Sequence, residues 1–218
     1  MNIIQYIKKM KTLILDCDGV LYPESQFPIY YLTKAIEKYA YSINISKEEF
    51  KNISKQTLER GEQGLFNFVL NLVHKNIDSF NEFCNNMIEL CNYNEIKRDD
   101  ELFALLLKAS KKYEICIFTN NCRAHLDKVY EKLFGKSLKD FPFPSYDISF
   151  TLKDGMFHPK QSKDGYINFL KKIKKEKKEC IVCDDSKANI NRCKEFGIQY
   201  EFITLENNLK KVLTKLLK

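Results

Sequence analysis

The sequence predicts an α/β protein: a doubly wound, Rossmann-like parallel sheet with an inserted all-helical domain. Two observations lead to this prediction. Short apolar runs alternate along the chain with longer stretches in which apolar residues recur at the helical period. The alternation is interrupted once, directly after the first apolar run, by a long segment of purely helical pattern.

The first apolar run, Leu13 to Leu15, ends in two carboxylates and a glycine, Asp16, Asp18 and Gly19. Such a run is typical of a buried parallel strand that delivers side chains to the carboxyl edge of a sheet. Two aspartates this close repel each other unless a cation, most simply a hard divalent one, lies between them. The same residues are equally compatible with a solvated turn. A calcium loop is disfavoured because residues 20–22 are apolar or aromatic.

Residues 23–95 show only helical patterns and are predicted to form a separate helical domain. Ser46, which precedes two glutamates, is a typical helix start, and Asp78 is a second one. The aromatic residues here follow the helical period, so we interpret them as core rather than as cofactor contacts. The apolar residues at helical spacing are Ile29, Leu32, Ile36 and Tyr39, then Phe50, Ile53 and Leu58, then Phe66, Val69, Leu70 and Val73, and finally Phe80, Phe83, Met87 and Leu90.

The remainder of the chain alternates between helices and strands, which predicts right-handed crossovers and a mostly parallel sheet. Gly135 and Gly197 follow two of the helices as stop signals. The predicted helices span residues 100–111, 123–134, 162–174, a segment ending at 196, and 206–217, and the predicted strands span residues 115–118, 147–151, 180–183 and 200–203.

The composition, 44% hydrophobic over 218 residues, fits one domain with an insertion or two small domains. Much of the net charge of +7 lies in residues 171–178. This segment lacks interleaved aromatic residues, so a solvated helix end is favoured over a nucleic-acid site, and the positive field would attract small anionic substrates. No signal peptide or membrane-spanning pattern is present, which predicts a soluble, cytoplasmic protein with no membrane partner.

The eight cysteines are predicted to be reduced. Cys17, Cys116, Cys180 and Cys183 lie in or beside apolar strands, where cysteine commonly serves as a small buried hydrophobe. Cys180 and Cys183 form a Cys-x-x-Cys sequence, but residues three apart on a strand point to opposite faces. No second pair completes a zinc site.

Three predicted strands end in polar clusters, and in a parallel sheet these ends share one edge. Four carboxylates at one edge require a cation, and a ligand set of oxygens alone favours Mg²⁺ over zinc. Lys160 would then meet an anion held by the metal. The clusters are Asp16 with Asp18, Thr119 with Asn120, and Asp184 with Asp185.

In this arrangement the chain resembles the haloacid dehalogenase superfamily of phosphohydrolases. Four motifs in the family's order are a stronger signal than any one of them. For the third motif His158 is the alternative to Lys160, because Pro159 precedes the lysine. Lys160 is favoured because Tyr166 then falls where the family has a helix aromatic, and because histidine is a poorer permanent cation at neutral pH. The matching residues are Asp16 to Val20, Thr119, Lys160, and Asp184 with Asp185.

The resemblance implies a catalytic core of residues 1–22 and 96–218, and a helical cap of residues 23–95 that closes over the catalytic edge. Residues 21–23, 119–121 and 184–186 are similar to those of pyrimidine 5′-nucleotidase-like members of the superfamily.

The resemblance also implies the roles of the site residues. Asp16 would be the nucleophile that forms an aspartyl-phosphate, and Asp18 would protonate the leaving group and then activate water. Thr119, Asn120 and Lys160 would bind the phosphate. The implied Mg²⁺ ligands are Asp16, Asp18 through its backbone carbonyl, Asp185, and Asp184 nearby or through water.

These roles imply a Mg²⁺-dependent phosphate monoesterase that acts on a small phosphorylated metabolite, with nucleoside 5′-monophosphates as candidate substrates. Two alternatives stay open. One is a phosphosugar phosphatase or phosphoglucomutase-like enzyme, because cap loops choose the leaving group and a fold does not fix the substrate. The other is a non-catalytic phosphate-binding module.

Overall fold

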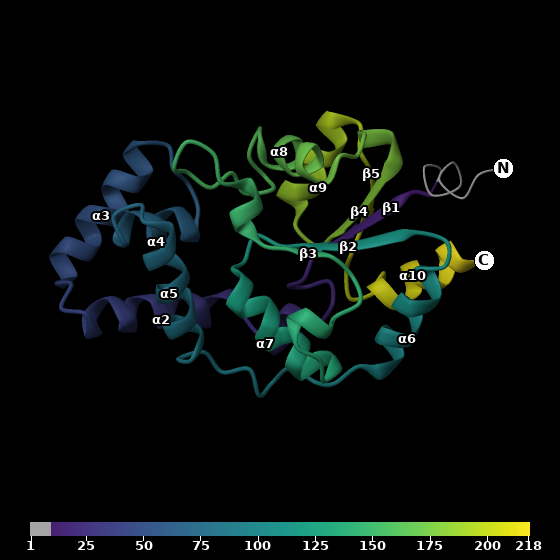
Figure 1. Ribbon diagram of the computed structural model, residues 1–218, viewed down its shortest axis with the longest axis horizontal. Helices are drawn as coiled ribbons and strands as arrows, with labels where there is room; N and C mark the ends of the chain where they lie inside the picture. The colour runs from purple at the N-terminus through teal and green to yellow at the C-terminus, as the bar shows by residue number, and fades with distance from the viewer. Residues whose placement is uncertain (1–9) are drawn as a thin grey trace.

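Within residues 10–218, five parallel strands form one sheet in the order β3-β2-β1-β4-β5 (Figure 1). The structure is a computed structural model that describes residues 10–218, without the side chain of Ile29. Residues 1–9 lie outside the described residues. They include the start of the predicted core and the part of the chain in which a signal peptide would begin. The strands are β1 Thr12–Leu15, β2 Glu114–Phe118, β3 Ser145–Tyr146, β4 Cys180–Asp184 and β5 Gln199–Phe202.

The first strand of the chain lies in the centre of the sheet. Its neighbours are β2 on one side and β4 on the other, and Leu15 pairs with both Ile117 and Cys183. The chain therefore runs outward from β1 through β2 to β3, and then crosses back to continue at β4. Reversal of strand order at this point creates the crevice in which open α/β sheets bind ligands. The predicted meeting of the ends of β1, β2 and β4 is confirmed.

Helices cover both faces of the sheet, as a doubly wound fold requires. Alternate strand residues enter different cores: Leu13 and Leu15 pack on one side, and Ile14 packs on the other. Cys183 and Cys180 likewise lie on opposite faces, as predicted. In Figure 1, α8 Gly165–Ile173 and α9 Lys187–Phe196 lie on one side of the sheet, and α6 Asp100–Ala109, α7 Arg123–Phe134 and α10 Leu209–Leu217 lie on the other.

The inserted segment forms a short 3₁₀ helix, Glu24–Gln26, and four α-helices that stand together at one end of the sheet (Figure 1). Helix α2 packs against α5, and α3 packs against α4. Ser46 begins α3 as predicted, with its hydroxyl accepting a hydrogen bond from the Glu49 N–H at 3.1 Å. Most of the apolar stripe is buried, although Leu58 and Leu90 are exposed. The four helices are α2 Ile29–Ser42, α3 Lys47–Glu59, α4 Leu65–Leu72 and α5 Ile77–Ile88.

The predicted strand at residues 147–151 is wrong. These residues form a 3₁₀ helix, Ile148–Thr151, and the strand precedes it at Ser145–Tyr146. The Asp147 carboxylate accepts a hydrogen bond from the Ser149 N–H at 2.8 Å, which closes the backbone into a turn and ends the strand. The helices predicted at 162–174 and 206–217 begin three residues late, at Gly165 and Leu209.

All eight cysteines are free thiols, as predicted. Residues 171–178 are mostly exposed and form a helix end and a turn, also as predicted. None of the helices within residues 10–218 has the length and apolar content needed to cross a membrane.

Candidate active site

Asp16 is the first residue beyond β1, and the sheet itself holds it in place. Its backbone N–H donates to the Cys183 carbonyl at 2.9 Å, which continues the pairing of β1 with β4. One carboxylate oxygen, Oδ1, accepts from the Cys17 N–H at 2.7 Å. Asp16 is only 8% exposed. A nearly buried carboxylate is thus fixed at the carboxyl edge of the central strand.

Gly19 allows the chain to turn directly after Asp18. Its φ is +72°, a backbone conformation that residues other than glycine rarely adopt. A Cβ atom at this position would lie 1.9 Å from Oδ2 of Asp185. The glycine therefore permits both the turn and the close approach of the Asp185 carboxylate to the end of β1.

Lys160 lies between two of the carboxylates and is 1% exposed. Its Nζ is 2.5 Å from Oδ2 of Asp16 and 2.9 Å from Oδ2 of Asp184, and it also donates to the Phe118 carbonyl at 3.2 Å. Burial alone would lower the pKa of Lys160, but the two carboxylates outweigh it and raise the pKa above its ordinary value. Lys160 is therefore a permanent cation. The loop that provides this ammonium also contains His158, the alternative residue for the third motif.

Asp184 ends β4 and is fully buried. Its two oxygens accept hydrogen bonds from Lys160, from the Asn189 side chain at 2.9 and 3.0 Å, and from the Ser186 N–H at 2.9 Å. The Tyr166 hydroxyl also donates to it at 3.4 Å. Asp184 thus anchors Lys160 below the surface of the site.

Asp185 follows Asp184 in the chain and is only partly buried. Burial and the charge of Asp184 raise the pKa of Asp185 to about 6. Burial, together with the charges of Asp184 and Asp18, also raises the pKa of Asp16, although Lys160 opposes this shift. Within residues 10–218, the carboxylates of Asp16, Asp184 and Asp185 thus lie close together, and Lys160 contacts two of them.

A hard divalent cation fits this edge. Asp16, Asp184 and Asp185 bring carboxylate oxygens within 4.8 Å of one another, and all donors are oxygens, which suits Mg²⁺. Asp16 and Asp185 line the cavity above the sheet edge, and the oxygens of Asp184 are engaged below it. Asp16 and Asp185 are therefore the side chains best placed to hold the ion.

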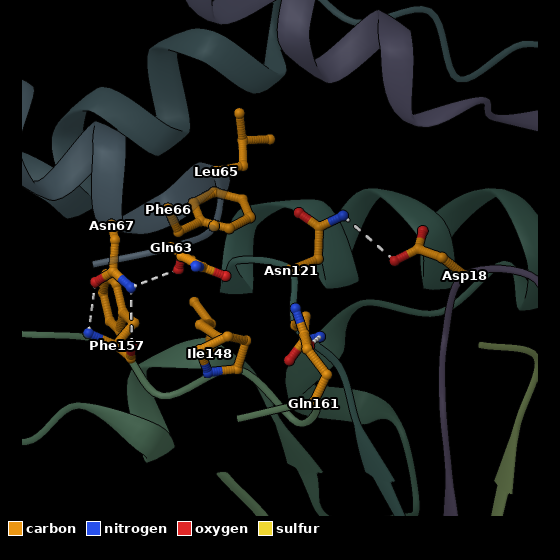
Figure 2. Close-up of a pocket in the computed structure, with 12 residues that line it drawn as sticks. Asp18, Gln63, Leu65, Phe66, Asn67, Asn121, Ile148, Phe157 and Gln161 are labelled. Carbon is orange, nitrogen blue, oxygen red and sulfur yellow. Dashed lines mark hydrogen bonds between the residues drawn. The ribbon is translucent and has the colours of Figure 1, made fainter. Parts of the chain in front are cut away.

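Two adjoining cavities open at this edge. The larger, about 460 Å³, is lined by Asp16, Asp18, Thr119 and Asp185 among others. The smaller, about 140 Å³, lies between the start of α4 and the sheet edge (Figure 2). Asp18 lines both cavities, and Asp16 lines the larger one. The residues that line the smaller cavity are Asp18, Gln63, Gly64, Leu65, Phe66, Asn67, Asn120, Asn121, Ile148, Phe157, Pro159 and Gln161.

The Asp18 carboxylate has four side-chain donors. Oδ1 accepts from the Tyr22 hydroxyl and from Nε2 of His125, the latter at 2.8 Å. Oδ2 accepts from the Asn121 amide at 3.3 Å and the Thr119 hydroxyl at 3.4 Å. Burial raises the pKa of Asp18, but the electrostatic interaction with His125 and the hydrogen bonds from His125, Tyr22 and Asn121 outweigh it. The pKa of Asp18 therefore lies well below its usual range.

Comparison with known protein families matches residues 10–197 to haloacid dehalogenase-like hydrolases. The chain belongs to this family. Among solved structures it is similar to the family enzyme BT-2542 from Bacteroides thetaiotaomicron, in complex with magnesium and inorganic phosphate (18% identity, TM-score 0.55, covering 93% of this chain and 98% of that one). It is also similar to a variant of CbbY from Rhodobacter sphaeroides, in complex with xylulose-(1,5)-bisphosphate (12% identity, TM-score 0.57, covering 92% and 89%). These likenesses show the shared fold.

In this haloacid dehalogenase-like hydrolase, the predicted site residues lie together although they come from distant parts of the sequence. Thr119 contacts Asp18, and the Asn120 side-chain oxygen accepts from the Lys160 N–H at 2.9 Å. Lys160 in turn connects Asp16 to Asp184.

The sequence reasoning missed His125. It lies in the first turn of α7 and is fully buried. A signal was present, because His125 precedes Val129 by one helical turn on a stripe of buried residues and comes four residues after Asn121. Sequence alone gives no reason to pair this histidine with Asp18, which lies more than a hundred residues away.

Proposed function

We propose that this hydrolase is a Mg²⁺-dependent phosphate monoesterase that forms an aspartyl-phosphate on Asp16. The observation that carries the proposal is the different setting of two aspartates two positions apart. Asp16 lies beside the buried cation of Lys160 and lines the larger cavity. Asp18 is held by hydrogen-bond donors and lines both cavities. This suits a phosphate in the larger cavity and a leaving group in the smaller one.

The reaction would proceed in two displacements. A carboxylate oxygen of Asp16 attacks phosphorus, the bond to the leaving oxygen breaks with its electron pair, and Asp18 gives that oxygen a proton. Asp18, now a carboxylate, takes a proton from water, whose oxygen attacks phosphorus and releases Asp16. Without substrate, the low pKa of Asp18 favours the carboxylate. The negative charge of a bound phosphate would raise its affinity for the proton that the first step needs.

Asp16 and Asp185 would hold Mg²⁺, together with the Asp18 backbone carbonyl, and Asp184 would act on the ion through water. When bound, the ion neutralises charge on the transferring phosphoryl group. Thr119 and Asn120 line the larger cavity and would bind phosphoryl oxygens. Lys160 is nearly inaccessible, so it would not contact the substrate phosphate. Its positive charge would instead act on the phosphate from behind the Asp16 carboxylate. The magnesium and phosphate bound in BT-2542, an enzyme of similar fold, support this assignment.

Residues 23–95 would act as a cap on a core of residues 1–22 and 96–218. The two segments that connect them lie side by side, since the Gln26 side-chain oxygen accepts from the Lys97 N–H at 2.9 Å. At the far end, the Asn67 side chain of α4 exchanges hydrogen bonds of 2.8 and 2.7 Å with the backbone C=O and N–H of Phe157 (Figure 2). The cap would thus be fastened over the cavities by both ends and would exclude water from the reaction.

The smaller cavity would receive the leaving group. Its lining offers amide side chains, such as Gln63, Asn121 and Gln161, together with apolar ones, and Asp18 is the one charged residue among the described residues that line it. A neutral leaving group with hydrogen-bonding groups suits this lining better than a second phosphate. We therefore propose nucleoside 5′-monophosphates as substrates, in line with the resemblance to pyrimidine 5′-nucleotidases. The same lining would accept a monophosphorylated sugar, which is the second candidate.

A panel of phosphorylated metabolites tests this proposal. Phosphate release would be measured with Mg²⁺ for nucleoside 5′-monophosphates, sugar monophosphates and sugar bisphosphates. We expect the highest kcat/KM on a monophosphate with a neutral leaving group. Preference for a bisphosphate would contradict the assignment of the smaller cavity, and absence of any Mg²⁺-dependent release would contradict the proposed function.

A further inference from the structure

We infer that His125 is a positioning residue that fixes Asp18 for proton transfer, and that Tyr93 orients His125. The inference rests on the proposed function, in which Asp18 moves the protons. His125 does not reach the substrate cavities, because it is fully buried and is absent from the linings of both. Any effect it has on the reaction must therefore act through Asp18.

The two oxygens of Asp18 have unequal surroundings. Oδ1 is held by Tyr22 and by His125, the latter at 2.8 Å. Oδ2 has the longer contacts, 3.3 Å to Asn121 and 3.4 Å to Thr119, and both of these residues line the larger cavity. Figure 2 shows Asn121 and Asp18 facing each other at the edge of the smaller cavity. The stronger pair of donors anchors Oδ1, so that Oδ2 is the oxygen free to exchange a proton.

The ring of His125 is itself oriented. An ionised Asp18 can only accept hydrogen bonds, so Nε2 must carry a proton. Nδ1 lies 2.8 Å from the Tyr93 hydroxyl, which can donate to it or accept from it. Tyr93 therefore sets the ring orientation, in the way that an outer hydrogen bond fixes a catalytic or metal-bound histidine.

The aromatic rings around His125 come from the two segments at which residues 23–95 join the rest of the chain. Phe27 belongs to the first connection and Tyr93 to the second. Their rings stack on each other with centroids 4.6 Å apart, and the His125 ring lies 5.1 Å from Phe27 and 5.5 Å from Tyr93. These rings help to bury His125 completely, which shields its hydrogen bonds from competition by water.

A histidine that only fills the core would predict different behaviour from one that positions Asp18. Loss of packing would slow every substrate alike. Loss of proton transfer would slow poor leaving groups more than good ones, because a good leaving group needs little protonation. The dependence on leaving group therefore separates the two roles.

The test compares wild type, His125→Leu and His125→Gln on p-nitrophenyl phosphate and on an alkyl phosphate, with Mg²⁺ saturating. General acid catalysis is worth about 10²–10⁴-fold. Misplacing the acid should remove part of this, so we expect His125→Leu to lose on the order of ten- to a hundredfold more kcat/KM on the alkyl ester than on the aryl ester. The losses are compared in kcat/KM because hydrolysis of the phosphoenzyme is common to both esters and affects kcat alike. His125→Gln keeps an N–H donor near the position of Nε2 and should recover part of the alkyl-ester rate. Equal losses on both substrates, or no recovery by glutamine, would overturn the inference.

Two further measurements keep the inference testable if these variants fold poorly. Tyr93→Phe removes one hydroxyl and should show the same selectivity at smaller amplitude, whereas the exposed control His74→Asn should show none. Nitrogen NMR of the wild-type ring should find a proton on Nε2. A neutral ring protonated only on Nδ1 would contradict the inference whatever the enzyme hydrolyses. If wild type releases no phosphate from either ester, the proposed function fails, and the NMR result still decides the geometry.

Discussion

Replacing Lys160 by methionine tests whether its charge stabilises the buried carboxylates of Asp16 and Asp184. Methionine is unbranched and apolar, so the change removes the charge and keeps much of the shape. It leaves the fully buried Asp184 without its cation, and it removes the ammonium 2.5 Å from Asp16. Breaking a buried ion pair from one side costs about 3–5 kcal/mol. At roughly 2–4 °C per kcal/mol for a chain of this size, Tm should fall by about 6–20 °C.

The stability loss should depend on pH with a defined sign. Burial and the charge of Asp184 raise the pKa of Asp16, and Lys160 opposes this, so the variant should show a still higher pKa at Asp16. A carboxyl whose folded-state pKa is raised favours folding below that pKa and opposes it above. The deficit of Lys160→Met relative to wild type should therefore shrink as the pH falls from 8 to 5, when both are measured without metal.

The assays are thermal unfolding at several pH values and phosphate release at saturating Mg²⁺. Removal of one electrostatic partner from a preorganised site typically lowers kcat by about 10²–10³-fold. Lys163→Met is the matched control: it removes an exposed lysine three residues away and should change stability by less than about 0.5 kcal/mol. A Lys160→Met protein with wild-type Tm and turnover would refute the role proposed for the Lys160 charge.

Three other predictions follow from the same geometry. Chelation should abolish phosphate release and added Mg²⁺ should restore it, so full turnover after verified metal removal would exclude a metal role. Gly19→Ala should raise the Mg²⁺ concentration needed for half-maximal activity, because the new Cβ would displace the Asp185 carboxylate and the turn costs about 1–2 kcal/mol; an unchanged Mg²⁺ titration would count against Asp185 as a ligand. Asn67→Ala should lower Tm and raise KM, because each orphaned backbone group of Phe157 costs about 1–3 kcal/mol, whereas the exposed Asn85→Ala should leave both unchanged.

The fold could be predicted wherever local signals were strong. Helix α7 was predicted at its observed bounds, because Gly135 follows it in a left-handed conformation that stops the helix. The strands β1, β2 and β4 were recognisable as apolar runs that end in polar residues. The strand at 147–151 was misplaced, because the turn that Asp147 forms with Ser149 leaves no signature in the apolar pattern.

The candidate site was predictable only in part. Asp16, Asp18 and Asp184 stand at strand ends, and the parallel sheet alone brings such residues together. His125 lies on a helix face and Tyr93 on a connecting segment, and their contacts depend on how residues 23–95 pack against the rest of the chain. Sequence periodicity marks such residues as buried, but it does not say which polar group they meet.

The central claim is that Asp16 and Asp18 do different work. The most direct measurement is mass spectrometry of the peptide that carries both residues, after rapid acid quenching with an activated phosphate ester. We predict phosphate on Asp16 in the wild type, none in Asp16→Asn, and accumulation on Asp16 in Asp18→Asn, because the variant loses the base that activates water. Phosphate found on Asp18, or a wild-type yield of phosphoenzyme from Asp16→Asn, would contradict the account.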